Sequence, residues 1–478
     1  MAPADRELTF ELSSLAELIL GGITPAPLAQ LRVRPTQPSQ LLRNDPFRPH
    51  VCTLPPSLSR MTVAGAFAVA ISSLFAAVSV LEDSPMQLHT TLTRRAFLAR
   101  GSLAAGAALA LPRLTLAQGS PNAKVNVGFV GVANRAGDNL NEVAQLADSV
   151  NVVALCDVDA KYLAAAKEKH PGAQTYADFR RLIDQKGIDA VVVSTPDHTH
   201  AVACAAALRT GRHVYCEKPL TRTVSEARVV ANLARQHRRV TQLGTQIHAT
   251  ANYRRVVELI QSKAIGLVRE VHVWVAASYG GMERPTDTPP VPAGFDWDLW
   301  LGPVEFRPYH PDYAPFKWRN WWAFGGGSLA DFGCHFMDLP HWALDLRQPL
   351  SAEPVDGPPV HPESTPPWAI VRYQHPARRS SAGETLPPVT LTWYHGSKQP
   401  SFLTEEQAQY FRSGVMFIGE RGNLLADYTR RQLLPEKDFA DFKPPAPSIP
   451  DSIGHHKEWI EAIRSGGSTT CNFDYSGA

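Results

Sequence analysis

Lysine is absent from the first part of this sequence: none occurs before residue 124, and all twelve lysines lie within residues 124–478. Cysteine is also scarce. The six present include no C-x-x-C pair and no zinc-type spacing, so the sequence predicts neither a disulfide framework nor a metal site. An excess of charge is missing too, with 47 basic against 45 acidic residues, which argues against a nucleic-acid binder or a polybasic membrane protein. A chain of 478 residues, 44% of them hydrophobic, has sequence enough for two or three domains.

Residues 1–120 carry no recognisable chemistry, but two of their features concern location. Residues 62–81 contain no charge and are long enough to cross a bilayer, so a membrane anchor is one interpretation. Arg94-Arg95, followed by a small apolar run and Thr115-Leu116-Ala117, resembles a twin-arginine export signal over residues 86–120. The alternative is a chance Arg-Arg pair before an alanine-rich helix.

Met86 begins a natural start for such a signal. We therefore predict that Met86 is the true start and that residues 1–85 are a non-native or disordered extension. On this interpretation the twin-arginine translocase carries the folded protein to the periplasm or the exterior. A native peptide mapped upstream of Met86 would contradict it.

The stretch from Lys124 to Asp157 has the pattern of a dinucleotide-binding unit. Two short apolar runs, Val125–Val130 and Val152–Cys156, flank a small-residue turn and a helical pattern, and an acid closes the second run. The turn lets backbone approach a pyrophosphate, and the helix N-terminus supplies N–H donors. Asp157 can accept hydrogen bonds from a ribose and would repel a 2′-phosphate, which favours NAD over NADP.

The glycine fingerprint of this unit is incomplete. Read as G-x-G-x-x-G, it has Gly131 first, Ala133 in the second place and Ala136 in the third, with Gly137 one place late. Ala133 adds a methyl group near the pyrophosphate, so we expect a slightly shifted turn. The residues expected to bind the cofactor here are Gly131, Ala133, Asn134, Arg135 and Asp157.

Helical and β-branched segments alternate up to residue 247 and predict about six βα units. We therefore expect an α/β fold whose N-terminal part, residues 121–247, is a Rossmann doubly wound parallel sheet. Ligands of such sheets bind beyond the carboxyl ends of the strands, where Thr195–His200 and Glu217–Pro219 are predicted to lie.

The remaining residues, 248–478, predict an α+β domain with an open, largely antiparallel sheet. Its strands are expected near residues 268–278, 368–373, 389–395 and 415–418, and a final helix near 455–464. An aromatic-dense stretch between residues 297 and 324 either packs a loop onto the sheet or forms the wall of a sugar-binding cleft.

Asp331 and His335 share one face of a helix that follows Gly325-Gly326-Gly327. A carboxylate one turn before an imidazole can orient it and raise its pKa, which suits a base that abstracts a hydroxyl proton, although an ordinary surface contact has the same spacing. The cluster Asp331, Cys334, His335 and His341 has no established metal geometry, so no metal is expected.

Several motifs together resemble the Gfo/Idh/MocA oxidoreductases, which include glucose–fructose oxidoreductase and inositol dehydrogenase. They are GFVGVANRAGDNL, VALCDVD, STPDHTHA, HVYCEKPL and GGGSLADFGCHFMD, and the resemblance runs from about Lys124 to the end of the chain. It implies that Lys218 lies between nicotinamide and substrate, and that Asp331 and His335 are the catalytic aspartate and histidine.

The same resemblance implies further contacts. Thr195 and Pro196 would line the cofactor with Glu217, and His200 would approach the nicotinamide ribose, whereas His198 is predicted to be structural. Trp322 and Asp338 are expected to contact the substrate. Related proteins use the outer face of the second sheet to form dimers or tetramers, so a homo-oligomer is expected. They also continue beyond the N-F-D-Y sequence, so this chain is expected to be truncated.

These observations predict an exported NAD-dependent dehydrogenase of a sugar, polyol or related hydroxy compound. His335, oriented by Asp331, would take the hydroxyl proton, and Lys218 would stabilise the alkoxide. Two alternatives remain open: an NAD-dependent glycoside hydrolase of the same fold, and a non-catalytic NAD-binding or sugar-sensing protein.

Overall fold

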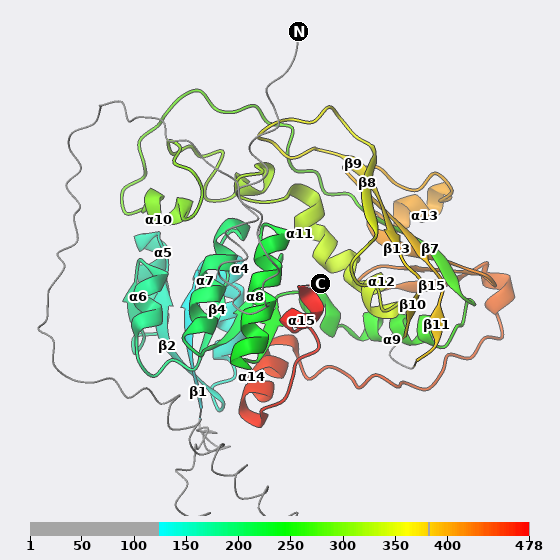
Figure 1. Cartoon of the computed structure of the whole chain (residues 1–478), viewed down its shortest axis with the longest axis horizontal. Helices are drawn as coiled ribbons and strands as arrows, with labels where there is room; N and C mark the ends of the chain where they lie inside the picture. Colours follow the sequence, from blue (N-terminus) through cyan, green and yellow to red (C-terminus); the bar gives the residue numbers. More distant parts are fainter. Residues whose placement is uncertain (1–123, 381–382, 478) are drawn as a thin grey trace, which may run out of the picture. The chain divides into compact units, whose positions relative to one another are not determined.

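The structure is a computed structural model that describes residues 124–380 and 383–477 (Figure 1). The predictions for residues 1–85, 62–81 and 86–120 lie outside this part of the chain. Within it, none of the helices combines the length and the apolar character needed to cross a bilayer.

The first sheet is parallel, with strand order β3-β2-β1-β4-β5-β6. Its strands are β1 (Val125–Val130), β2 (Val150–Cys156), β3 (Gln174–Tyr176), β4 (Ala190–Val193), β5 (His213–Cys216) and β6 (Thr241–Leu243). The strand order reverses between β1 and β4, which is the switch point where such sheets bind ligands. The predicted Rossmann doubly wound sheet is confirmed.

Helices cover this sheet on both faces, as the two sides of β4 demonstrate. Val191 and Val193 pack into one apolar core with α6, α7 and α8, whereas Ala190 and Val192 face a second core with α4 and α5. Alternate residues of a strand point to opposite faces, so a strand buried on both sides is apolar throughout. These helices are α4 (Arg135–Ala144), α5 (Ala160–Lys169), α6 (Phe179–Asp184), α7 (Asp197–Arg209) and α8 (Val224–His237).

Side-chain caps begin three of these helices and explain why the sequence pattern located them well. Asp159 and Asp178 each accept a backbone N–H two residues later, at the start of α5 and α6. Thr223 and Glu226 form a capping box at the start of α8.

The second sheet is mixed, with strand order β15-β14-β13-β7-β12-β9-β8. The central pair β7/β12 is parallel and the other neighbours are antiparallel, so the predicted open, largely antiparallel sheet is confirmed. Its strands are β7 (Val268–Val275), β8 (Ser351–Asp356), β9 (Ala369–His375), β12 (Val389–His395), β13 (Gly414–Gly419), β14 (Asn423–Ala426) and β15 (Arg431–Leu434). A separate pair is formed by β10 (Arg378–Arg379) and β11 (Thr385–Leu386).

Helices beside the second sheet carry two of the predicted catalytic residues, Asp331 and His335 of α11. The apolar side of α9, α11 and α12 packs against β7, β12 and β13 in one core. The remaining helices are η1 (Gln246–Ala249), α9 (Ala251–Gln261), α10 (Trp297–Leu301), η2 (Lys317–Asn320), α11 (Gly327–Phe336), α12 (Asp338–Ala343), α13 (Glu405–Tyr410), η3 (Glu436–Phe439), α14 (His455–Ser465) and α15 (Phe473–Ser476).

The end of the described chain returns to the first sheet. Trp459 and Ile460 of α14 are buried in the core beneath β1, and Phe473 of α15 is buried against α7 and α8. An ion pair of 2.7 Å between Arg235 and Asp474 also joins α8 to α15, which lie side by side in Figure 1. The helices of residues 455–477 therefore complete the apolar cores that pack against the first sheet, whose first strand begins at Val125.

Candidate active site

A cavity of about 430 Å³ lies beyond the carboxyl ends of β1, β4 and β5. Its lining brings together the predicted catalytic residues Lys218, Asp331 and His335, although Lys218 precedes Asp331 by 113 residues. Of the residues predicted to bind the cofactor, all but one also line it: Gly131, Ala133, Asn134, Arg135, Asp157, Thr195, Pro196, Glu217 and Lys218.

The turn after β1 requires glycine at its first position. Gly131 has φ of +88°, and a Cβ there would approach the carbonyl oxygen of Ser194 to 2.5 Å. Ala133 and Asn134 follow on the cavity side, and the N-cap Asn134 makes no side-chain bond to the first turn of α4. The backbone N–H groups at this helix start can therefore receive an anionic group such as a pyrophosphate.

Asp157, directly after β2, connects the end of that strand to the turn after β1. Its Oδ2 accepts from the Val132 N–H at 3.0 Å, and its Oδ1 accepts from the Asp159 N–H at 3.0 Å. Burial raises the pKa of this carboxyl, and the two backbone hydrogen bonds oppose the rise. Each oxygen retains a further lone pair, so Asp157 can still accept from ribose hydroxyls.

Arg135 and Glu217 line the cavity as a pair. Arg135 Nε donates to Glu217 Oε1 at 3.0 Å, and Asn139 donates to the same oxygen at 2.9 Å. Arg135 Nη2 is buried without a hydrogen-bond partner. A buried, unpaired guanidinium N–H beside the glycine turn fits a site for a phosphate-bearing ligand, so the residues present match the dinucleotide that the turn predicts.

The ammonium of Lys218 is held by Asp331. Lys218 Nζ lies 2.5 Å from Asp331 Oδ1 and 2.8 Å from the Asp331 carbonyl oxygen. Arg319 Nε lies 3.0 Å from the same carboxylate oxygen. Burial raises the pKa of Asp331, but the charges of Lys218 and Arg319 outweigh it, so the net pKa lies below the ordinary value. The Lys218–Pro219 peptide is cis.

Asp331 does not orient His335 through a hydrogen bond, and its charge opposes but does not outweigh the other effects on the His335 pKa, so the predicted net rise is wrong. His335 Nδ1 is buried without a hydrogen-bond partner, because the Asp331 carboxylate turns to the two cations instead. Burial lowers the pKa of His335 to about 3, and the nearby Lys218 charge contributes in the same direction. The imidazole is therefore neutral at pH 7, with an unpaired ring nitrogen.

The prediction that His200 contacts the cofactor is also contradicted. Its Nδ1 lies 2.7 Å from the Pro219 carbonyl oxygen and its Nε2 lies 2.7 Å from the Thr195 carbonyl oxygen. His200 is buried and does not line the cavity. It connects the loops after β4 and β5, the two loops that present Thr195 and Lys218. His198 is structural as predicted, with Nε2 2.8 Å from the Trp300 carbonyl oxygen.

The two predicted substrate contacts lie elsewhere. Trp322 is 41% exposed and outside the cavity lining. Asp338 is buried outside the cavity, where His248 and Tyr475 bond to its carboxylate. Asp338 follows His335 by three residues, but it begins α12, after α11 has ended at Phe336.

Most of the aromatic residues form a core of their own, which is the plainer of the two interpretations. Trp297, Trp300, Tyr313, Trp321 and Phe324 pack together. Trp300, Phe316 and Trp318 also line the cavity, and their role as a sugar-binding wall stays a prediction. The guanidinium carbon of Arg319 lies 4.1 Å from the centre of the Trp318 ring, and the same guanidinium forms an ion pair with Asp331.

Asp197 is a cavity residue that was not singled out from the sequence. It opens α7, is 4% exposed, and lines the cavity with Lys218, Arg319 and Asp331. Burial raises its pKa to about 8, although Arg319 and Lys218 oppose the rise. The sequence signal that could have identified Asp197 is its position between Pro196 and the histidines of the same motif. Among the carboxyl groups that line the cavity, Asp331 is therefore ionised at pH 7 and Asp197 is protonated.

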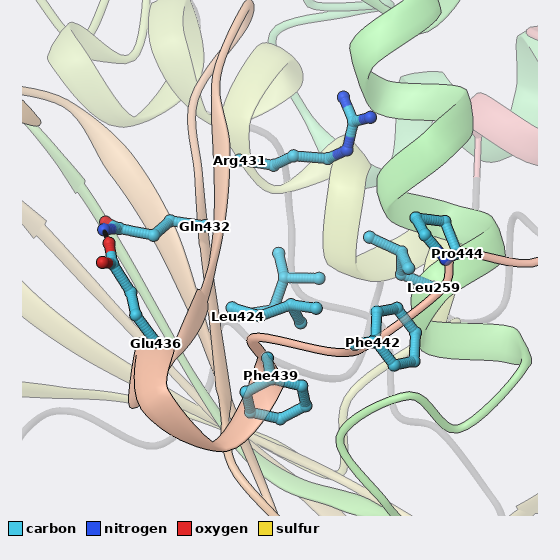
Figure 2. Close-up of a pocket in the computed structure, with 9 residues that line it drawn as sticks. Leu259, Leu424, Arg431, Gln432, Glu436, Phe439, Phe442 and Pro444 are labelled. Carbon is cyan, nitrogen blue, oxygen red and sulfur yellow. Dashed lines mark hydrogen bonds between the residues drawn. The ribbon is translucent and has the colours of Figure 1, made fainter.

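A second cavity, of about 320 Å³, lies beside β14, β15 and η3 (Figure 2). Figure 2 shows Phe439 and Phe442 close to Leu259 and Leu424, with Arg431 and Glu436 at its edges. It contains none of the predicted catalytic or cofactor residues.

Comparison with known proteins matches two segments to one family. Residues 125–245 match the Gfo/Idh/MocA model described as "Oxidoreductase family, NAD-binding Rossmann fold", and residues 265–379 match "Oxidoreductase family, C-terminal alpha/beta domain". The first match spans all six strands of the first sheet, and the second covers β7, β8 and β9 of the second sheet together with α11.

Inositol 2-dehydrogenase of Salmonella typhimurium is 31% identical over 150 residues, which is 31% of this chain and 45% of that protein. Inositol 2-dehydrogenase of Leifsonia xyli is 32% identical over 213 residues, covering 42% and 61%. The chain thus spans about half the length of the curated relatives it matches.

The WlbA dehydrogenase from Bordetella pertussis, solved in complex with NADH and UDP-GlcNAcA, is 19% identical with a TM-score of 0.51, covering 74% of this chain and 93% of that one. At this identity the likeness shows the fold.

Proposed function

We propose, from the premise that this chain belongs to the Gfo/Idh/MocA oxidoreductases, that it transfers hydride between NAD and a CH–OH group of a sugar, polyol or related compound. The observation that carries the proposal is the meeting of Lys218, Asp331 and His335 in the cavity that the glycine turn and Asp157 also line. The inositol dehydrogenases among its relatives support the choice of substrate class.

Three side chains divide the proton chemistry. Lys218 donates a hydrogen bond to the reacting oxygen and stabilises the negative charge that develops on it. Asp331 holds the Lys218 ammonium in place through its contact of 2.5 Å. Neutral His335, which lines the cavity, accepts the hydroxyl proton on its imidazole.

A low pKa makes His335 a weak base, so it depends on Lys218 to acidify the hydroxyl. A bound nicotinamide would supply the hydride acceptor. Gly131, Arg135 and Asp157 would hold the dinucleotide, and the Asp157 carboxylate favours NAD over NADP.

The test is to purify the protein from its native envelope fraction, denature it and identify any released nucleotide by mass spectrometry. Stoichiometric NAD, followed by NADH formation with one member of a panel of sugars and polyols, is the expected result. A protein that carries no nucleotide, and that binds none when titrated with NAD, would overturn the proposal.

The location and assembly belong to the same proposal. The Arg94-Arg95 signal supports export by the twin-arginine translocase to the periplasm or beyond, and residues 62–81 would anchor the chain if they are expressed. Free nicotinamide is scarce outside the cytoplasm, so a tightly held cofactor recycled by a second substrate suits such a location.

A homo-oligomer assembled through the second sheet is proposed as well, and sedimentation of the purified protein tests it.

A second candidate, an NAD-dependent glycoside hydrolase of the same fold, is favoured by one observation. Asp197 lines the cavity with a pKa of about 8, so at pH 7 it holds a proton that a leaving glycosidic oxygen could take. Release of sugar from an aryl glycoside without net NADH formation would identify this activity. NADH accumulation with free sugars would identify the dehydrogenase.

A further inference from the structure

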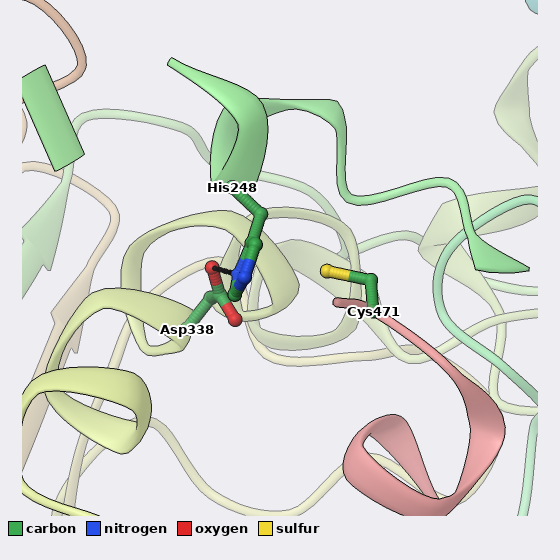
Figure 3. Close-up of side chains that lie close together, drawn as sticks. All are labelled: His248, Asp338 and Cys471. Atoms are coloured by element: carbon green, nitrogen blue, oxygen red, sulfur yellow. Dashed lines mark hydrogen bonds and ion pairs between the residues drawn. The ribbon is translucent and has the colours of Figure 1, made fainter. Parts of the chain in front are cut away.

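Outside the catalytic cavity, three metal-binding side chains converge at one buried point. His248 of η1, Asp338 of α12 and Cys471 each offer a ligand atom, and these atoms lie within 4.8 Å of one another. Their exposed fractions are 2%, 8% and 0%. Figure 3 shows the sulfur of Cys471 pointing toward the imidazole of His248, which in turn bonds to Asp338. None of the three lines the catalytic cavity.

We propose that His248, Asp338 and Cys471 bind a single Zn²⁺ ion. An imidazole, a carboxylate and a thiolate form a ligand set that Zn²⁺ accepts in proteins, and the hard cations Ca²⁺ and Mg²⁺ would not select a thiolate. Ligand bonds of about 2.0–2.3 Å around a tetrahedral ion place the ligand atoms roughly 3.3–3.7 Å apart. The observed spacing therefore needs side-chain adjustments of about 1 Å at most.

The neighbours of the cluster already orient two of the three ligands. His248 stacks on the Trp342 ring, with centroids 3.8 Å apart, which fixes the plane of the imidazole. The Tyr475 hydroxyl donates to Asp338 Oδ1 at 2.6 Å, leaving Oδ2 toward the imidazole. Hydrogen bonds of this kind commonly hold ligating carboxylates in position around bound metals.

Charge balance also favours a cation here. Among the described residues, the ion pair of Asp338 is with His248 alone, 2.9 Å away, with no lysine or arginine beside the carboxylate. A buried carboxylate without a firm counter-charge is unfavourable. A divalent ion would supply that charge, and it would also displace the thiol proton of Cys471, which becomes a thiolate when it binds zinc.

The site would join three segments that are distant in sequence. Cys471 precedes α15, and its carbonyl oxygen accepts from Leu243 N–H of β6 at 2.8 Å. His248 follows β6, and Asp338 belongs to the second-sheet region. A metal there would fasten the returning end of the chain to both sheets. This role is independent of the proposed enzymatic activity.

The sequence did not suggest this site, because 90 residues separate His248 from Asp338 and a further 133 separate Asp338 from Cys471. The expectation that the cysteines form no metal site rested on local spacing alone. The expectation of no metal at Asp331, Cys334, His335 and His341 rests on the same ground and stays a prediction.

The test uses the full chain, purified without chelators from cells grown with added zinc. Elemental analysis is expected to find about one Zn²⁺ per chain, and Cys471→Ser is expected to lose it. Cys204→Ser is the matched control, because Cys204 is equally buried in the same apolar core but does not belong to the group of three converging ligand atoms. Wild-type protein without stoichiometric metal, or a Cys471→Ser variant that retains the metal in full, would overturn the proposal.

A second measurement does not depend on the variant folding. Wild-type protein refolded with Co²⁺ in place of zinc is expected to show a thiolate-to-cobalt charge-transfer band in the near ultraviolet. Cobalt bound without that band would exclude Cys471 as a ligand and overturn the proposed set. Removal of the metal by a chelator is expected to lower the thermal midpoint, which is measurable without any substrate.

Discussion

Lys218 and Asp331 form an ion pair whose side chains are only 13% and 11% exposed. In such surroundings the position of the ammonium depends on its partner, and the partner depends on the ammonium for its charge balance. The pair lies where the reacting oxygen is expected. Substitution of either Lys218 or Asp331 should therefore lower kcat much more than it lowers the affinity for the nucleotide.

Lys218→Met is expected to lower kcat by about 10²–10³-fold, because the developing alkoxide loses its donor. The dissociation constant for NAD should change by a few fold at most, since other residues hold the dinucleotide. Steady-state kinetics and isothermal titration measure the two effects. Lys263→Met, at a partly exposed lysine paired with Glu384, is the control and should leave both unchanged. An equal loss in NAD affinity and in kcat would assign Lys218 to binding.

The Asp197 carboxyl should make stability depend on pH. Its pKa is about 8 in the folded chain, against an ordinary value near 3.8, so between these values the folded state retains a proton that the unfolded state has lost. Stability therefore falls as pH rises from about 4 to about 8. One pKa unit corresponds to about 1.4 kcal/mol, so Asp197→Asn should gain at least about 1 kcal/mol at pH 8 relative to pH 5.

Urea unfolding of wild type and Asp197→Asn at the two pH values measures this gain. Asp178→Asn is an informative control, because Asp178 also begins a helix but its pKa is lowered through its bond to Arg180. That variant should lose stability at neutral pH. A pH dependence of wild type that Asp197→Asn reproduces unchanged would refute the assignment.

At the scale of elements, the first turn of α7 is tied to the loop after β5 by one imidazole. A neutral His200 donates to one of its two carbonyl neighbours, and an imidazolium donates to both, while burial lowers its pKa. His200→Ala leaves at least one buried carbonyl unpaired. We expect a loss of about 2–3 kcal/mol in unfolding free energy and a lower kcat.

Urea unfolding measures the loss, with His170→Ala at the less buried end of α5 as the control. His200→Gln, which keeps one donor, should recover part of the stability. No recovery, together with a loss in His170→Ala of the same size, would show that the two carbonyl contacts contribute nothing specific.

The elements themselves were largely predictable. The bounds of β4 and β5 follow from short apolar runs beside turns, because a strand buried on both faces tolerates few polar residues. Pairwise contacts in the site were less accessible. The spacing of Asp331 and His335 places both on one helix face, but it does not reveal that Lys218 and Arg319 attract the carboxylate away.

The same limit explains His200, Trp322 and Asp338. Their motifs indicated the neighbourhood of the cavity, whereas their side-chain directions depend on partners distant in sequence, such as Pro219 and His248. The missed Asp197 differs from these, because its burial could not be read from a helix start that usually faces solvent.

At the scale of the whole molecule, α14 and α15 supply part of the core of the first sheet. Ile460→Ala removes a fully buried side chain from beneath β1 and should cost about 2–5 kcal/mol in unfolding free energy. Ile453→Ala, the same change at a residue that is 57% exposed, is the control and should cost much less. NAD affinity measured in urea should fall with stability in the first variant only. Equal effects of the two changes would contradict the packing.

The return of the last helices to the first sheet also sets an order of events during synthesis. Residues 244–454 separate β6 from α14, and at roughly 5–20 residues per second a ribosome needs roughly 10–40 s to make them. Throughout that interval the nascent nucleotide-binding half lacks Ile460 and Phe473 and leaves apolar surface for a chaperone to cover. A ribosome-bound chain that ends before residue 455 should therefore not retain NAD, so the protein would acquire its cofactor only after release from the ribosome.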